Sequence, residues 1–281
     1  MLNRKLHVKV KKLFLFLANV CVILIFFFPL AWIISLSLKD EAQIFEYPPR
    51  LIPKKVSLEN YLWVIQNGKI FTYISNSVKI IILTVIGTLL LSIPAAFSLS
   101  RHRIGKSNII LIALLVFQMI SPLVIAIPLY RYFLSLNLID SHFGVIIVYI
   151  ALQGAFSCWI IRGFLNTVPI ELDEAAKIDG CTDLQILIKI LLPLSLPGIA
   201  SSIILVAINS WAQFIIPFML LDRDALYPVA VGILSFQTTT TVLTYHLLAA
   251  ASVLAILPAL LIFLTLQKFI IHALMAGAVK G

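Results

Sequence analysis

The sequence predicts an all-α, polytopic membrane protein with six transmembrane helices. Of its 281 residues, 61% are hydrophobic and only 12% are charged, and the mean hydropathy is +1.08. The apolar residues come in long runs separated by polar stretches. A run of about 20 apolar residues is the length of helix that crosses the roughly 30 Å hydrocarbon core of a bilayer. These observations exclude a soluble globular protein.

The first predicted transmembrane helix covers residues 13–38. It follows a basic tail, residues 1–12, that contains no acidic residue. A cleaved signal peptide is the competing interpretation, but it would have a shorter apolar region and a cleavage site marked by small residues. Residues 39–70 are polar and contain three prolines, which indicates an external loop.

The other five predicted spans lie in a core that covers residues 71–272, before a tail at 273–281. They are residues 74–99, 109–130, 143–165, 198–221 and 247–271. Their prolines, Pro94, Pro122, Pro128, Pro217 and Pro258, are candidate kinks because proline removes a backbone donor.

The basic residues predict the orientation of the spans. With both termini in the cytoplasm, the cytoplasmic segments contain 13 of the 21 Lys and Arg residues. Positive charge collects on the cytoplasmic side of membrane proteins. The net charge of +9 therefore reflects topology, and we expect no nucleic-acid partner. We predict that the lipid bilayer surrounds the apolar spans.

The segment 166–194, between the fourth and fifth spans, is unusually polar and is predicted to be cytoplasmic. Acidic residues open its first helix, at Glu171, Asp173 and Glu174, where the positive end of the helix dipole favours them. Gly180 is well placed to end that helix in the left-handed conformation.

A second short helix follows the glycine. Thr182 and Gln185 have the spacing of a capping box, and Pro193 predicts that this helix ends at about residue 192. Ala175 and Ala176 predict a low surface that another protein can approach closely. These residues alone leave an ordinary cytoplasmic loop as an equal alternative.

The stretches "EAAKIDG" and "ILLP" match the EAA motif, so the chain resembles the permease subunits of bacterial ATP-binding-cassette (ABC) importers. "LNLIDSHFG" and "AGAVKG" resemble the carbohydrate-uptake branch, in particular the shorter partner of the maltose-type pair. The resemblance covers about residues 35–281. It implies the MetI-like permease fold and a place in the bacterial cytoplasmic membrane. One departure is Trp211-Ala212-Gln213-Phe214, where the family usually has an acidic or amide pair after the tryptophan.

The resemblance also implies partners and roles. A second, homologous permease would complete a heterodimer, two ATPase subunits would bind at the EAA loop, and an extracytoplasmic binding protein would deliver the solute. No cofactor is expected on this chain, because ATP and magnesium belong to the ATPases. Glu174 would contact the ATPase, the alanines would allow close seating, and Gly180 would set the turn. The predicted coupling residues are Glu171, Glu174, Ala175, Ala176, Asp179, Gly180 and Pro193, with Gly277 and Lys280 in an interface tail.

The sequence contains no recognisable energy-coupling or catalytic motif. "GKS" at 105–107 lacks the glycine of a phosphate-binding loop, because position 100 is serine. We expect no metal site and no enzyme activity. An ion-coupled carrier remains an alternative, although the spans contain almost none of the ionisable groups that such carriers keep in the membrane. A membrane scaffold that does not transport is another.

Neutral polar and aromatic residues inside the spans are the candidates to line a pathway, because they suit sugar hydroxyls and sugar faces. The competing interpretation is that they hold the helices together. Other small polar solutes, such as glycerol phosphate or glucosylglycerol, also fit the pattern. The candidates are Asn76, Gln118, Ser121, Gln153, Asn209, Trp211 and Gln213.

Overall fold

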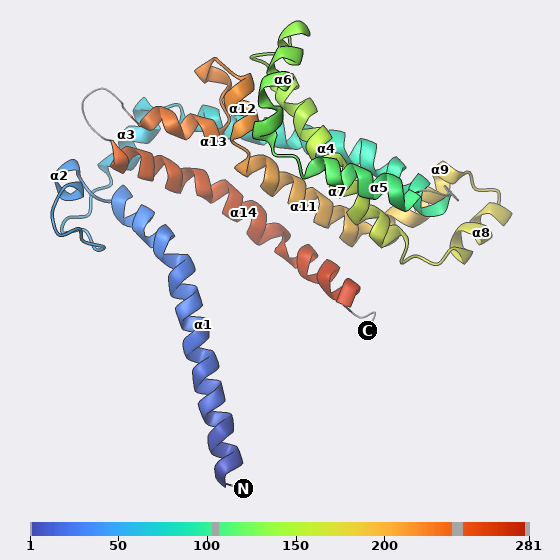
Figure 1. The fold of residues 1–281 in the computed structure, drawn as a ribbon, viewed down its shortest axis with the longest axis horizontal. Coiled ribbons are helices and arrows are strands. Elements are labelled where there is room, and N and C mark those ends of the chain that lie inside the picture. The colour runs from blue at the N-terminus through green and yellow to red at the C-terminus, as the bar shows by residue number, and fades with distance from the viewer. Residues whose placement is uncertain (1, 103–106, 238–243, 279–281) are drawn as a thin grey trace. The chain divides into compact units, whose positions relative to one another are not determined.

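The computed structural model describes residues 2–102, 107–237 and 244–278, and the described part consists of helices and the segments that connect them (Figure 1). The longer helices are α1 (Leu2–Ser37), α3 (Glu59–Asn67), α4 (Ile70–Arg101), α5 (Ser107–Gln118), α6 (Pro122–Ser135), α7 (His142–Leu165), α8 (Glu171–Ile178), α11 (Leu196–Ala212) and α14 (Tyr245–Ala278). The shorter elements are α2 (Glu41–Ile44), α9 (Asp183–Ile186), the π-helical segment Leu187–Leu191, α10 (Leu192–Leu194), α12 (Ile215–Leu220), α13 (Val229–Gly232) and two 3-10 turns, Asp224–Leu226 and Ile233–Phe236.

Four helices in the described residues are long and apolar enough to cross a membrane. They are Lys12–Ser37, Ile70–Arg101, His142–Leu165 and Tyr245–Thr265, and they correspond to four of the six predicted spans. Two bent helix pairs account for the other two, if each pair is one span. The all-α, multi-span fold class is therefore confirmed.

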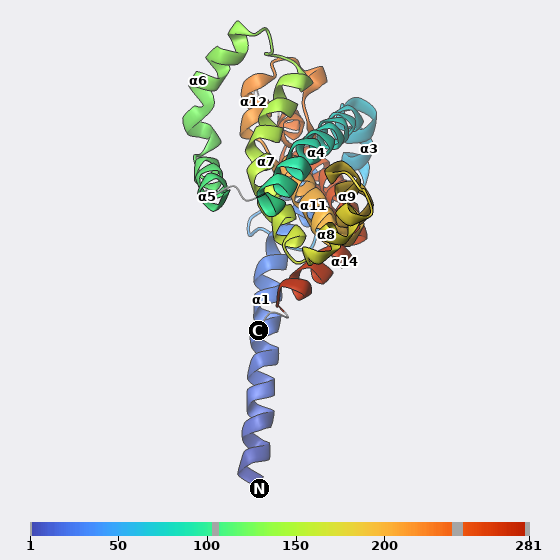
Figure 2. The same cartoon turned by 90° about the vertical axis from the view of Figure 1, so that its right-hand side faces the viewer.

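The third and fifth predicted spans are each interrupted in the structure. Between α5 and α6 the chain turns by 89° just before Pro122 (Figure 2). This proline occupies the first turn of α6, where a missing N–H costs nothing. The fifth span ends at Ala212, and α12 begins only at Ile215. By contrast, Pro94 and Pro258 lie inside α4 and α14 without ending them.

The chain divides into two compact units, residues 1–68 with 233–256 and residues 69–232 with 257–281. In the first unit, Asn60 joins the end of α1 to α3. Its buried amide donates to the carbonyls of Ser37, at 2.9 Å, and Lys39, at 2.8 Å. The predicted external loop thus contains two helices, α2 and α3.

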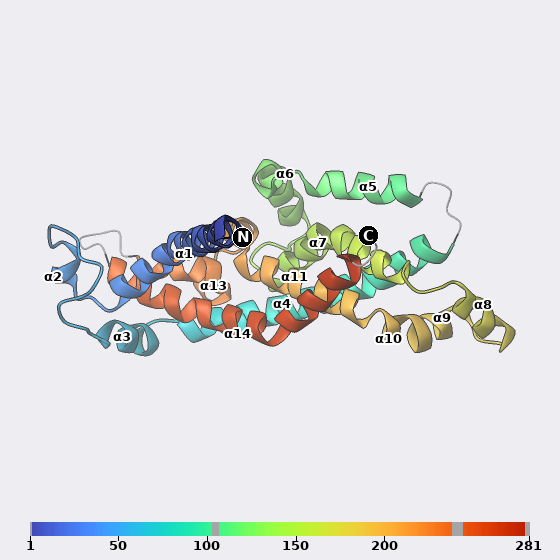
Figure 3. The ribbon, with the colours of Figure 1, turned by 90° about the horizontal axis from the view of Figure 1, so that it is seen from below.

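The core of the second unit consists of α4, α7 and α11. In Figures 1 and 3, α4 runs along α7, and α11 packs against both. One apolar cluster includes Ala96, Ile161 and Leu191 and lies near α8 and α9. A second, which includes Ile80, Tyr149 and Leu220, lies near α6 and α12. We call these the α8 end and the α12 end of the unit.

Candidate functional site

The loop at the α8 end begins with α8 and a glycine turn. Glu171, Asp173 and Glu174 occupy the first turn of α8, as predicted. Gly180 follows the helix with φ = 83°, so its predicted left-handed conformation is confirmed. A side chain in this conformation is strained, which explains why glycine suits the position. No atom lies within 4 Å of where its Cβ would be.

The predicted capping box of the next helix is also confirmed. The backbone N–H of Gln185 donates to Thr182 Oγ1 at 3.3 Å, and the N–H of Thr182 donates to Gln185 Oε1 at 2.9 Å. The prediction that this helix ends before Pro193 is wrong. The π-helical segment shifts the hydrogen-bond pattern just before the proline, and the helix continues through Pro193 to Leu194. The chain then bends by 79° into α11.

Two faces of α8 differ in exposure. Glu171, Glu174, Ala175, Asp179 and Gly180 are exposed. Ala176 is only 6% exposed and packs in the apolar cluster of the α8 end. The prediction that both alanines form an outer surface is therefore wrong for Ala176. Asp173 and Ala176 lie three residues apart and share the inward face of the helix.

Apolar side chains accompany the acids on the exposed face of the loop. Ile178 is 87% exposed, and Leu172 is 43% exposed. The exposed side of the loop therefore presents both acidic and large apolar groups.

The inward face of α8 is held by an ion pair that the sequence did not reveal. Arg101, the last residue of α4, places Nε 2.5 Å from Asp173 Oδ2, and each side chain is only 9% exposed. The same guanidinium donates from Nη2 to the carbonyl of Val168 at 2.9 Å. From the sequence, Arg101 indicated only the cytoplasmic side of the membrane. Asp173 was only one of three acidic residues at the start of the predicted helix.

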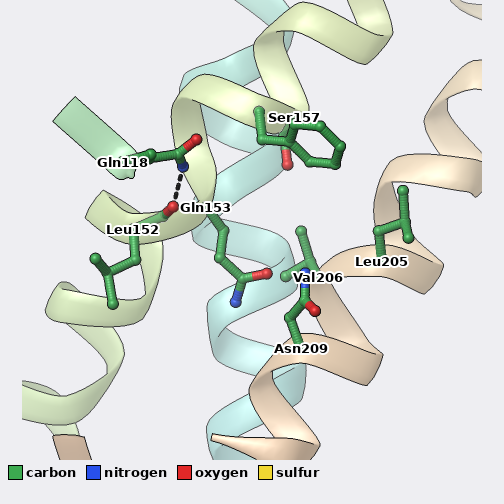
Figure 4. Close-up of a pocket in the computed structure, with 8 residues that line it drawn as sticks. Gln118, Leu152, Gln153, Ser157, Leu205, Val206 and Asn209 are labelled. Carbon is green, nitrogen blue, oxygen red and sulfur yellow. Dashed lines mark hydrogen bonds between the residues drawn. The ribbon is translucent and has the colours of Figure 1, made fainter. Parts of the chain in front are cut away.

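A cavity of about 210 Å³ lies between α5, α7 and α11. It brings together three of the predicted pathway residues, Gln118, Gln153 and Asn209 (Figure 4). Five other residues line it: Leu152, Phe156, Ser157, Leu205 and Val206. Sequence reasoning missed these five, although Ser157 and Phe156 follow Gln153 at one-turn helical spacing.

The three amides of the cavity differ in their bonding. Gln118 donates to the carbonyl of Leu152, and Gln153 Nε2 lies 2.7 Å from Ser210 Oγ. The Asn209 side chain makes no hydrogen bond to any described residue. It is exposed, and Figure 4 shows the amides of Gln153 and Asn209 in the same part of the cavity. Beside the cavity, Phe156 and Trp159 stack with ring centroids 5.7 Å apart.

The structure does not bring the other four pathway candidates to this cavity. Asn76 is buried and donates to the carbonyls of Ala225, at 2.9 Å, and Tyr227, at 3.2 Å. Ser121 caps α6 by accepting from the N–H of Leu123. Trp211 and Gln213 lie at the end of α11. For Asn76 and Ser121, the hydrogen bonds favour the interpretation that these polar groups hold the structure together.

Ion pairs at the α12 end hold the segment that follows α12. Asp140 accepts from the N–H groups of Asp222, at 3.1 Å, and Arg223, at 3.0 Å, and pairs with the guanidinium of Arg223. Burial tends to raise the pKa of Asp140. The bonds from Arg223 and Asp222 outweigh it and hold the pKa below its ordinary value.

A second carboxylate, Asp224, pairs with Lys69 at 2.5 Å and accepts from the hydroxyl of Tyr73. Burial again tends to raise its pKa, but these two bonds lower it on balance.

Two further site predictions concern metals and the tail. Within the described residues, no group of three or more His, Cys, Asp and Glu side chains could hold a metal ion. Gly277 lies in the last turn of α14. Lys280 lies outside the described residues.

Comparisons with known proteins identify relatives of this arrangement. Residues 88–275 match the family described as the inner membrane component of binding-protein-dependent transport systems. The arabinooligosaccharides transport system permease protein AraQ of Bacillus subtilis is 31% identical, over 92% of each chain. The trehalose/maltose transport system permease protein MalG of Thermococcus litoralis is 29% identical, over 96% of this chain and 98% of the relative.

A solved structure has the same fold. It is a chain of a bacterial ABC transporter involved in the import of the acidic polysaccharide alginate, with a TM-score of 0.77 and 23% identity. The match covers 94% of this chain and 96% of that one.

Proposed function

The chain belongs to the family of inner membrane components of binding-protein-dependent transport systems, and from this premise we propose that its solute is a sugar of oligosaccharide size. It is a permease subunit of an ABC importer. Relatives of this chain are named for the transport or uptake of arabinooligosaccharides, of trehalose or maltose, and of diacetylchitobiose. All of these solutes are saccharides, which supports a saccharide here.

The cavity between α5, α7 and α11 carries the proposal for this chain. Its lining combines three amides and one hydroxyl with apolar side chains. Amides bind sugar hydroxyls, and apolar groups cover the C–H faces of a sugar ring, so the combination suits a saccharide better than an ion. The amide of Asn209 keeps its full hydrogen-bonding capacity for a solute, since no described residue uses it.

Energy for transport comes, in this proposal, from two ATPase subunits that bind the exposed face of α8. Glu171, Glu174, Ala175, Asp179 and Gly180 supply that face, together with Leu172 and Ile178. Both chain termini and the α8 end lie in the cytoplasm, and the α12 end faces the extracytoplasmic binding protein. A second, homologous permease completes the pathway, which alternates between inward-facing and outward-facing states.

Reconstitution tests the proposal. The chain is purified together with its partner permease and ATPase subunits and is placed in liposomes. The liposomes receive ATP, the binding protein, and labelled disaccharides or glycerol phosphate. We expect ATP-driven uptake of a saccharide. Uptake of glycerol phosphate alone would replace the sugar assignment, and uptake by this chain alone under a proton or sodium gradient would contradict the ABC mechanism.

A variant locates the solute. Asn209→Leu should lower uptake by roughly tenfold, since the loss of one or two hydrogen bonds to a solute costs about 1–2 kcal/mol. The matched control is Ser121→Ala, which removes a polar group of a membrane helix away from the cavity. Equal uptake by Asn209→Leu and wild type would remove the cavity from the pathway.

A further inference from the structure

The ion pair of Arg101 and Asp173 joins the loop helix α8 to a core helix of the bundle. Oδ2 of Asp173 lies 2.5 Å from the guanidinium. Its other oxygen, Oδ1, is buried and accepts no hydrogen bond from a described residue. The buried charge of Asp173 thus depends on Arg101 for its compensation, and a buried charge without compensation is strongly unfavourable.

Two more contacts connect the same end of α4 to the segment that precedes α8. Arg101 Nη2 donates to the carbonyl of Val168, and Ser100 Oγ donates to Asn166 Oδ1 at 2.6 Å. Ala176, one turn after Asp173, packs in the cluster that includes Ala96 of α4. The inward face of α8 is therefore attached to α4 by charge and apolar packing, and the segment before α8 is attached to α4 by hydrogen bonds.

Helix α4 leads from this attachment to the cavity. Nine residues before Arg101, about 13 Å along a helix, Ser92 donates to the carbonyl of Gly154 at 2.9 Å. Gly154 follows Gln153, which lines the cavity. One continuous helix thus contacts α8 at its end and the cavity wall of α7 along its length.

We propose that Arg101 is a positioning residue that makes α8 and α4 move as one body, so that a displacement of α8 by its partner reaches the cavity wall directly. This inference rests on the proposed function. The moving element is α4 with α8 attached, and the exposed face of α8 is where the displacement is applied.

A double-mutant cycle with Arg101→Gln and Asp173→Asn tests the pair in the reconstituted importer. Each single variant should lower the amount of sugar taken up per ATP hydrolysed by roughly tenfold, a typical size for coupling between sites. The double variant should recover part of the loss, because no unpaired charge stays buried. A simple loss of assembly would instead lower uptake and hydrolysis in proportion.

Two results of the cycle would overturn the proposal. In the first, the single variants bind the ATPases and take up as much sugar per ATP hydrolysed as the wild type does. The other is strictly additive effects in the double variant, since additivity would mean that the two residues act separately.

A cross-link supplies a test that does not depend on the stability of these variants. The substitutions Ser100→Cys and Asn166→Cys are made in a background that carries Cys21→Ser and Cys181→Ser and keeps the buried Cys158. The two new thiols are joined by oxidation or by a short bifunctional thiol reagent. If α4 and the α8 segment move together, uptake should stay within about twofold of the reduced protein, because the link adds no new constraint. Each single-cysteine variant under the same treatment is the control.

A link that blocks uptake, with recovery on cleavage of the link, would show that the segment before α8 must move relative to α4 and would refute the rigid connection. The wild-type importer is measured in the same vesicles. If it takes up no sugar with ATP, the proposed function fails. If it transports and the linked variant does not, only the rigid connection fails.

Discussion

The two ends of the second unit are held together in different ways. At the α8 end, Arg101 and Asp173 form a pair in which each side chain is 9% exposed. At the α12 end, Arg223 is 69% exposed and its partner Asp140 is 22% exposed. Breaking a buried pair leaves a charge without water or a partner, whereas an exposed pair contributes little.

Bonds to the backbone also hold the α12 end together. Asn76 donates to two carbonyls, Asp140 accepts from two N–H groups, and Ser77 accepts from the N–H of Val229 at 2.8 Å. The α8 end therefore contains one buried ion pair, whereas the ion pairs of the α12 end are exposed and are accompanied by bonds to the backbone. Single substitutions should have unequal effects at the two ends.

The largest effect is expected for Arg101→Leu. It leaves the carboxylate of Asp173 buried and uncompensated, so the free energy of unfolding should fall by about 3 kcal/mol. Thermal unfolding of the purified chain, followed by tryptophan fluorescence, measures the change. The control at the same end is Lys177→Leu, which breaks the exposed pair of Lys177 with Asp183 and should cost less than about 1 kcal/mol. Equal losses would contradict the contrast between buried and exposed pairs.

Local features of the α8 end could be predicted from the sequence, but the ion pair that attaches α8 to α4 could not. The left-handed Gly180 and the capping box of Thr182 and Gln185 depend on residues within one or two turns, and both were confirmed. The pair of Arg101 with Asp173 joins residues far apart in the chain, and nothing in either local pattern distinguishes this acid from Glu171. Ala176 is buried because it lies on the same inward face of α8 as Asp173.

The membrane spans show the same division. Four spans and their approximate bounds follow from length and hydropathy. The breaks near Pro122 and after Ala212 depend on tertiary packing, since Pro94 and Pro258 leave their helices unbroken. For the cavity, residue type identified Gln118, Gln153 and Asn209. Residue type could not distinguish these three residues from Asn76, because an amide side chain is the same in the sequence whether it binds a solute or a neighbouring carbonyl.

The second effect, at the α12 end, is expected for Asn76→Leu. It removes the donor for the carbonyls of Ala225 and Tyr227, and a buried acceptor without a partner costs about 2 kcal/mol. Thermal unfolding and limited proteolysis after residue 221 measure the loss. Asn209→Leu is the matched control, since that amide has no partner among the described residues, and it should change stability little. A loss at Asn76 as large as that of Arg101→Leu would contradict the expected difference between the two ends.

A smaller effect is expected for Gly180→Val at the α8 end. The left-handed backbone costs a β-branched residue about 1–2 kcal/mol, and the open space around the glycine adds no clash. Gly163→Ala is the control, because this glycine also has open space but lies inside α7, where alanine should stabilise by about 0.5–1 kcal/mol. ATP-driven uptake should fall far more than stability if α8 seats in a partner. Uptake that follows stability alone would count against a docking role for this turn.

The smallest effect is expected for Arg223→Gln, at about 0.5 kcal/mol in thermal unfolding at pH 7, because the pair is exposed and Asp140 keeps its two backbone donors. Its pH dependence is more informative. The pKa of Asp140 is lowered in the folded chain, so its contribution to stability is complete above the unfolded value of about 3.9 and is lost as the pH falls through the folded value. Stability at the α12 end should therefore hold from pH 7 to pH 5 in the wild type. In Arg223→Gln the folded pKa moves up toward the ordinary value, so the loss should be smaller and should be complete at a higher pH. An identical pH profile would assign the lowered pKa to the backbone N–H groups alone and make the cohesion of this end independent of its ion pair.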